Sequence, residues 1–307
     1  RRLRAGIDGQ WRRVTFEVTL DPKNIDGTLV KDAYAQVRIN RAVRIRAGQF
    51  KLPGSAEYQT SARTLDFMER SALASSIAAG RDIGVMLSGG LASSLEYEAG
   101  LFKGDGNGRL SRAGITAAGR LLWTPVNDVT LGASFTEGRT SPIDSDPANG
   151  LEGRSSSGYR FFERVYVQGR RTRAGVEARW APGRWRFAAE GLRAHDERAE
   201  QGLELEDLPG VAGLGWSTSV LRQFGRRPGG TRSRLREWDL GLRYDGLSFD
   251  DDGPNTQNDS VRPRATDVRA KGGGTVTGTA SWSPIRWTRI VTSAGVERFD
   301  EARSAPE

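Results

Sequence analysis

The sequence predicts an all-β fold, a single transmembrane antiparallel β-barrel. Three observations predict it: apolar and polar residues alternate with period two, the connections alternate between short and long, and no apolar run reaches the roughly 20 residues that a membrane-spanning helix needs. The 307 residues have a mean hydropathy of -0.55. A barrel allows so low a value, because one face of every strand is polar.

Alternation recurs from one end of the chain to the other, as strands with one polar face require. In residues 14–20 the apolar side chains take even positions, and in residues 33–39 they take odd ones. Residues 42–47 repeat the pattern with Arg44 and Arg46 on the polar side. We predict about fourteen strands, near residues 1–8, 14–20, 33–39, 42–47, 82–87, 95–99, 113–123, 127–136, 171–180, 185–195, 212–222, 237–247, 275–283 and 287–299.

The connections between these segments alternate between short and long along the chain. Outer-membrane barrels show this rule because periplasmic turns are tight while extracellular loops are free to grow. A soluble β-sandwich also has alternating strands, but its loops would follow no two-sided length rule. The connection at 223–236 is longer than its place predicts. Short connections lie near 9–11, 40–42, 88–91, 124–127, 181–184 and 283–286, and long ones at 21–31, 51–80, 103–112, 137–170, 196–211 and 249–274.

Composition narrows the chemistry. Cysteine is absent, which excludes disulfides, thiolate nucleophiles and Cys-based metal sites. His195 is the only histidine, and no catalytic set, metal site or cofactor site is predicted. The net charge is +8 and most basic residues are arginines, a bias that a GC-rich genome would also produce.

Three motifs resemble the phosphate-selective porin O and P family: Gly48-Gln49-Phe50-Lys51-Leu52-Pro53, Thr64-Leu65-Asp66-Phe67-Met68-Glu69-Arg70 and Gly80-Arg81-Asp82-Ile83-Gly84-Val85. In that family similar motifs close a strand, follow in a loop that folds into the barrel, and open the next strand. The resemblance implies an outer-membrane porin, a sixteen-stranded homotrimer of Gram-negative bacteria, that passes small anions, phosphate above all.

The same resemblance sets the expected organisation. Residues 1–307 form one barrel domain truncated at both ends, because about fourteen strands leave one missing at each end of an expected 16. Residues 51–80 are the inward-folded constriction loop. A signal peptide before Arg1 and an aromatic-ended strand after Glu307 are expected in the full reading frame.

If lipid takes the apolar face of each strand, the other face lines the bore. A guanidinium is always protonated and offers a planar fork of donors that fits phosphate oxygens. Several in sequence would let an anion exchange one partner for the next, and acids on the same wall would keep binding weak enough for release. The candidate anion pathway consists of Arg38, Arg44, Arg46, Lys51, Arg63, Arg70, Arg81 and Arg120. The predicted bore also includes Arg2, Arg4, Arg13, Arg173, Arg179, Arg186 and Arg243.

Other interpretations stay open. Mixed charges can simply pair with one another along a wet wall, and Glu69 and Arg70 can fix the loop to the wall. The porin can be general, or selective for sulfate, polyphosphate or organic acids. A soluble basic β-protein that binds nucleic acid is disfavoured, so the expected partners are small anions and outer-membrane lipid, with no nucleic acid. Its aromatics would be interleaved with basic residues, whereas here tryptophans cluster at strand ends: Trp123, Trp180, Trp185, Trp238, Trp282 and Trp287.

Overall fold

The computed structural model describes residues 4–22, 29–104, 114–140, 153–159, 167–200, 207–225, 237–251, 271–285 and 288–300. These residues form one antiparallel sheet in which every strand pairs with its neighbours in sequence, from β1 to β14. The strands are β1 (Ala5–Trp11), β2 (Val14–Leu20), β3 (Val30–Arg38), β4 (Arg44–Lys51), β5 (Arg81–Gly90), β6 (Leu95–Phe102), β7 (Thr116–Val126), β8 (Val129–Thr140), β9 (Gly169–Trp180), β10 (Trp185–Arg198), β11 (Leu208–Phe224), β12 (Glu237–Asp251), β13 (Lys271–Ile285) and β14 (Thr288–Phe299).

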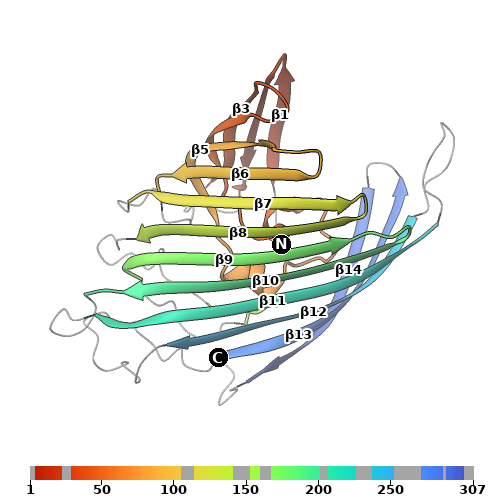
Figure 1. Cartoon of the computed structure of the whole chain (residues 1–307). Helices are drawn as coiled ribbons and strands as arrows, with labels where there is room; N and C mark the ends of the chain where they lie inside the picture. The colour runs from red at the N-terminus through yellow and green to blue at the C-terminus, as the bar shows by residue number, and fades with distance from the viewer. Residues whose placement is uncertain are drawn as a thin grey trace.

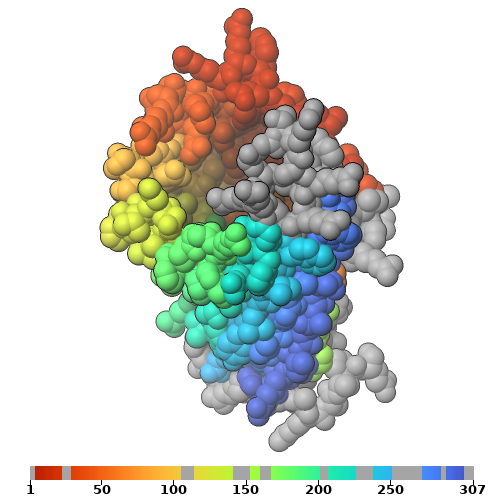
Figure 2. Space-filling view, turned by 90° about the vertical axis from the view of Figure 1, so that its right-hand side faces the viewer, coloured from red at the N-terminus to blue at the C-terminus, as the bar shows by residue number. Residues whose placement is uncertain are grey.

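The sheet curls into a barrel wall. In Figure 1, β7 to β11 cross the near side, and β13 and β14 lie behind them at the right. The space-filling view shows the colours running round the molecule in sequence order, with a recess between the orange strands and the green ones (Figure 2). The predicted all-β barrel fold is confirmed.

The two faces of the wall differ as the alternation predicts. Val85, Leu101 and Val176 point outward and are 51%, 59% and 65% exposed. Arg120 and Arg243 point inward and are 8% and 2% exposed. Apolar side chains on the outside of a barrel face lipid, so the inner face is the polar one. Aromatic rings gather at the short-turn ends of the strands, as in the stacked pair Trp238–Trp282, whose centroids are 5.4 Å apart.

Several strands differ from their expected limits, among them the first, the fourth and the eleventh. The first strand runs to Trp11, which pairs with Val14 across a two-residue turn. Arg13 therefore lies in the turn and not on the inner face of a strand; Arg2 lies outside the described residues. Strand β11 begins at Leu208 although Pro209 and Gly210 interrupt the pattern, because backbone pairing with β10 continues to Arg198.

Two short helices lie in the long connection between β4 and β5: α1 (Ala56–Gln59) and α2 (Ala72–Ser76). This segment, residues 52–80, appears in orange behind β9 and β10 in Figure 1. Within the part of the chain that the structure describes, no helix is long and apolar enough to cross a membrane.

Candidate functional site

The base of segment 52–80 is fixed to the wall from which it leaves. The backbone N–H of Leu52 donates to the carbonyl of Gly80 at 3.1 Å, which closes the segment where β4 and β5 begin to pair. Leu52 belongs to a buried apolar cluster with Phe50, Met86, Phe102 and Ala118, side chains that β4 to β7 carry on the inner face. Apolar packing therefore fills the lumen at this point of the wall.

The far side of the segment packs against the opposite wall. Leu73 of α2 and the following Ile77 are buried against inner-face side chains of β10 to β12. Glycine makes this approach possible: a Cβ at position 215 would lie 2.9 Å from the Cβ of Leu73 and 3.1 Å from the Cδ1 of Ile77. The wall residues of this cluster are Leu192, Ala194, Val211, Leu247 and Phe249.

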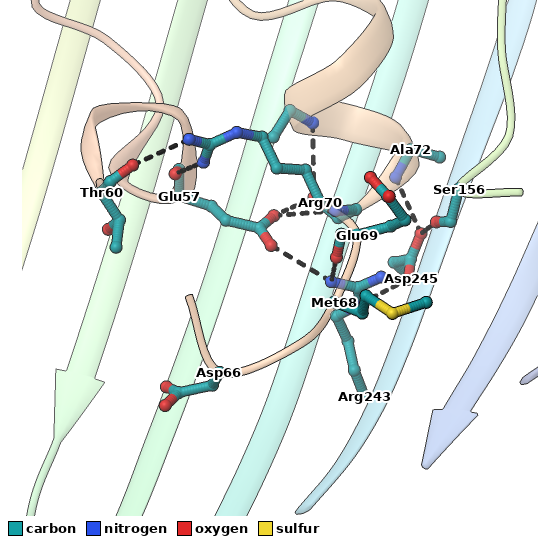
Figure 3. A network of polar contacts seen from close by, with 12 residues as sticks. Glu57, Thr60, Asp66, Met68, Glu69, Arg70, Ala72, Ser156, Arg243 and Asp245 are labelled. Carbon is teal, nitrogen blue, oxygen red and sulfur yellow. Dashed lines mark hydrogen bonds and ion pairs between the residues drawn. The ribbon is translucent and has the colours of Figure 1, made fainter. Parts of the chain in front are cut away.

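Arg243 of β12 is the centre of a polar network that holds the segment in place (Figure 3). Its Nη1 donates to a carboxylate oxygen of Glu57 at 3.1 Å and to the carbonyl of Glu69 at 2.9 Å. Its Nε donates to Asp245 at 2.8 Å, and Asp245 also accepts from the backbone N–H of Ala72 at 2.9 Å. Arg243 therefore bonds to the segment on both sides of residue 66, and Asp245 caps the N-terminus of α2.

A second wall carboxylate caps α1. Glu190 of β10 accepts from the backbone N–H of Ala56 at 3.0 Å and of Glu57 at 3.1 Å. Helix N-termini leave N–H groups without intrahelical partners, and an anion is favoured beside them. We call Glu190, Arg243 and Asp245 the wall anchors.

The tip of the segment is bound by two further arginines. Arg186 of β10 donates to Asp66 at 2.9 Å. Arg289 of β14 donates to the carbonyl of Leu65 at 2.7 Å and to Asp66 at 3.5 Å. Side chains from β10, β12 and β14 thus hold segment 52–80 in place. Its helices, of four and five residues, are too short to be stable without such contacts.

Lys51 and Arg70 bond to the end of α1. The Nζ of Lys51 donates to the carbonyls of Gln59 at 3.0 Å and Thr60 at 3.2 Å. Arg70 donates to the carbonyls of Glu57 and of Thr60, the latter at 2.8 Å. Cations are favoured at a helix C-terminus, where carbonyls lack partners. Both predicted pathway residues therefore contribute to the shape of the segment.

A cavity of about 1100 Å³ lies between segment 52–80 and the inner face of β1 to β5. We call it the lumen cavity. Four predicted pathway residues line it: Arg46, Lys51, Arg63 and Arg81. Its charged lining consists of five basic residues, these four and Arg4, and of four acidic ones, Asp8, Glu17, Asp32 and Glu69. Basic residues outnumber acidic ones by one.

Arg46 of β4 is held rigidly at the edge of this cavity. Its Nε and Nη2 donate to the side-chain oxygen of Gln36 at 3.0 and 2.8 Å. Its guanidinium carbon lies 4.5 Å from the ring centroid of Tyr34 and 5.3 Å from that of Phe50, within the range of cation–π attraction. Within the described residues Nη1 has no hydrogen-bond acceptor, so one edge of the fork stays available.

Arg63 and Arg81 differ in the hydrogen bonds and ion pairs that they form with the protein. Arg81 of β5 donates from Nε and Nη2 to the two carboxylate oxygens of Asp32, each at 3.0 Å. Arg63 is exposed, and its guanidinium forms no ion pair or hydrogen bond with any residue that the structure describes. Arg63 is therefore the cavity's least committed cation.

The other predicted pathway residues do not line the lumen cavity. Arg120 of β7 is buried against Glu177 at 2.7 Å and lies 3.6 Å from Glu98. Arg38 and Arg44 face each other across β3 and β4 at the short-turn end. Arg70 lies within the segment. The additional predicted bore residues Arg173, Arg186 and Arg243 also face inward, where each pairs with a carboxylate: Asp196, Asp66 and Asp245.

Sequence reasoning did not identify the wall anchors as partners of the segment. Glu190 and Asp245 stand 134 and 173 residues from the N–H groups that they cap. No local pattern marks such a pair. The only sequence signal was their place on the polar face of a strand.

The curled antiparallel sheet, its two-sided wall and its charged lumen define an outer-membrane porin. Residues 1–271 match the sequence profile of the family described as phosphate-selective porin O and P. The match covers most of the 307 residues, so the chain belongs to this family and is a channel rather than an enzyme. No protein of curated function matches it.

Solved structures with a similar fold are outer-membrane proteins. In-vitro folded OmpT of Vibrio cholerae has a TM-score of 0.61 at 10% identity, over 97% of this chain and 79% of that one. The trimer form of OmpT gives 0.56 at 13% identity, over 97% and 81% of the two chains. OmpF of Salmonella typhi, in complex with daunomycin, gives 0.51 at 11% identity, over 96% and 89%. The likeness establishes the fold and, together with the family, an outer-membrane location.

Proposed function

We propose that this porin passes small anions, phosphate among them, by passive diffusion through the lumen cavity, with segment 52–80 as its constriction. The observation that carries the proposal is the charged lining of that cavity, in which five basic residues face four acidic ones. A mixed lining with a small positive excess attracts anions without holding them too tightly to leave.

The donors that Arg46 and Arg63 keep available support this proposal. Arg46 keeps one edge of its guanidinium free and is pre-oriented by Gln36 and two rings. Arg63 is exposed and uncommitted within the described residues. A planar fork of donors binds phosphate oxygens two at a time, so these two arginines are the proposed ligands of a passing anion. Phosphate as the preferred anion rests on the family's description.

Recordings in planar bilayers test the proposal. Under a KCl gradient, the wild-type reversal potential should show preference for chloride, and added phosphate should reduce chloride conductance. The double variant Arg46→Gln with Arg63→Gln should lose most of both effects. Arg38→Gln is the matched control, because Arg38 is an exposed inner-face arginine outside the cavity.

A cation-selective wild-type channel would refute the proposal. The second candidate, a general porin, is favoured by the near balance of charges in the cavity. Weak chloride preference, no phosphate block and no response to the double variant would support it instead.

We also propose that the protein is a homotrimer, as the trimer form of the structurally similar OmpT is. Light scattering of the detergent complex, corrected for bound detergent, should give three times the mass of one chain. A mass of one chain in several mild detergents would contradict this.

A further inference from the structure

Three arginines lie on the lipid-facing side of the wall, outside the lumen. Arg139 of β8, Arg170 of β9 and Arg193 of β10 are all exposed. Each alternates with a buried neighbour that faces inward: Thr140, Arg171 and Leu192. We call these three residues the outer arginine patch.

The patch lies at the end of the strands where the long connections begin. Arg193 is eight residues from Trp185 along β10, and Arg139 is ten from Val129 along β8. At about 3.3 Å per residue, with the strands tilted by about 40°, these separations correspond to heights of about 20 and 25 Å above the short-turn edge. The apolar band of such a barrel is about 25 Å tall, so the patch lies at its extracellular edge.

The outward faces below and beside the patch are apolar. On its own strands, Phe135 and Val176 lie further toward the short-turn end and are 51% and 65% exposed. On β5 and β6, Ile83, Val85 and Leu101 occupy the long-connection end. A cluster of guanidiniums at this edge is therefore local to β8, β9 and β10, which lie side by side on the near wall in Figure 1.

Among the residues that the structure describes, two members of the patch have no carboxylate partner. Arg139 and Arg170 stand directly opposite each other in the register of β8 and β9, where like charges repel. Arg170 lies 3.4 Å from Glu197, but no hydrogen bond or ion pair of Arg139 or Arg193 occurs among the described residues. Glu137, on the same face as Arg139, is the one other carboxylate on these strands' outward face near them.

We propose that the outer arginine patch binds the phosphate groups of an anionic outer-leaflet glycolipid, the lipopolysaccharide of the surrounding membrane. The bilayer places lipid phosphates at the height of the patch, and guanidiniums bind phosphate through paired, charge-assisted hydrogen bonds. Bound phosphate also relieves the repulsion between Arg139 and Arg170. This site is separate from the lumen and serves the attachment of lipid, not the passage of an anion.

The test uses the full chain in phosphatidylcholine nanodiscs with added lipopolysaccharide, and native mass spectrometry measures the lipid that is retained. The double variant Arg139→Gln with Arg193→Gln should bind about tenfold less tightly or worse, since it loses charge-assisted bonds. Arg222→Gln is the matched control, because Arg222 of β11 is exposed on the outward face at the opposite, short-turn end of the wall. Its retention should equal that of the wild type.

Two further measurements keep the result unambiguous. Single-channel conductance of the double variant should match the wild type, which shows that the barrel is folded. Dephosphorylated lipid should bind the wild type about tenfold less tightly, and free inorganic phosphate should not displace the intact lipid at equal concentration. Undiminished retention by the double variant, or equal binding of dephosphorylated lipid, would overturn the proposal and leave the proposed anion passage untouched.

Discussion

The two walls on either side of segment 52–80 use the same residue types for different purposes. On the β9–β12 wall, Arg243 is 2% exposed and bonds to the carboxylates of Glu57 and Asp245. On the β1–β5 wall, Arg46 borders a cavity of about 1100 Å³ and keeps donors free. The surroundings of an arginine decide its role. Where the segment packs against the wall, guanidiniums bind its carboxylates and carbonyls. Where the segment lies away from the wall, guanidiniums are accessible to solvent and solute.

The largest loss of stability is expected from a substitution of Arg243 on the β9–β12 wall. Arg243→Met should lower the free energy of unfolding by about 3–5 kcal/mol, because the variant leaves buried carboxylates without their cation. Urea unfolding in vesicles measures the loss, and protease cleavage within residues 52–80 should become faster. Arg179→Met, an exposed inner-face variant in β9, should change neither. Wild-type stability of Arg243→Met would mean that the network does not hold the segment.

The apolar half of the same contact is the next largest. Leu73 is 0% exposed in the cluster between α2 and the wall. Leu73→Ala should cost about 2–4 kcal/mol through lost burial and the cavity left behind. The same unfolding assay should show a smaller loss, about 1–2 kcal/mol, for Leu214→Ala, because its side chain faces lipid, which fills the space that truncation leaves. Equal losses for the two variants would contradict the docking of α2.

A change in the opposite direction, overfilling the contact, should have a smaller effect. Gly215→Ala places a methyl group 2.9 Å from the Cβ of Leu73 and should destabilise by about 1–3 kcal/mol. Gly191→Ala is the control, since its nearest neighbour would be 3.8 Å away. Channel recordings of Gly215→Ala should also show greater open-channel noise, because α2 is displaced. Unchanged open-channel noise and unchanged stability would contradict this prediction and show that the wall moves to accommodate the methyl group.

The smallest change concerns the β1–β5 wall. Asp32→Asn removes the ion-pair partner of Arg81, whose side chain is 11% exposed. Stability should fall by about 1–2 kcal/mol, because Asn keeps one acceptor for Arg81 and both side chains border the lumen cavity. The lumen cavity gains one net positive charge, so the chloride-to-potassium permeability ratio should rise roughly twofold. Asp128→Asn, in the short turn after β7, should leave the ratio unchanged. A fall in the ratio for Asp32→Asn would contradict the proposed pathway.

Much of the barrel could be predicted because its signal is local. Alternation of the kind seen in residues 33–39 indicates which side chains face lipid. The lengths of the connections indicate at which end of the barrel each connection lies. Strand β11 was harder, since pairing with β10 overrides Pro209 and Gly210. The wall anchors could not be predicted, because a carboxylate on a polar face gives no sign of the helix it caps more than a hundred residues away.

Capping from such distant strands has a consequence for biogenesis. The two short helices of residues 52–80 can be capped only when β10 and β12 are in place, because Glu190 and Asp245 lie on those strands. Contacts of such large sequence separation carry a high loop-closure entropy cost and slow folding. We therefore expect residues 52–80 to reach their final position only after β10 and β12 have paired.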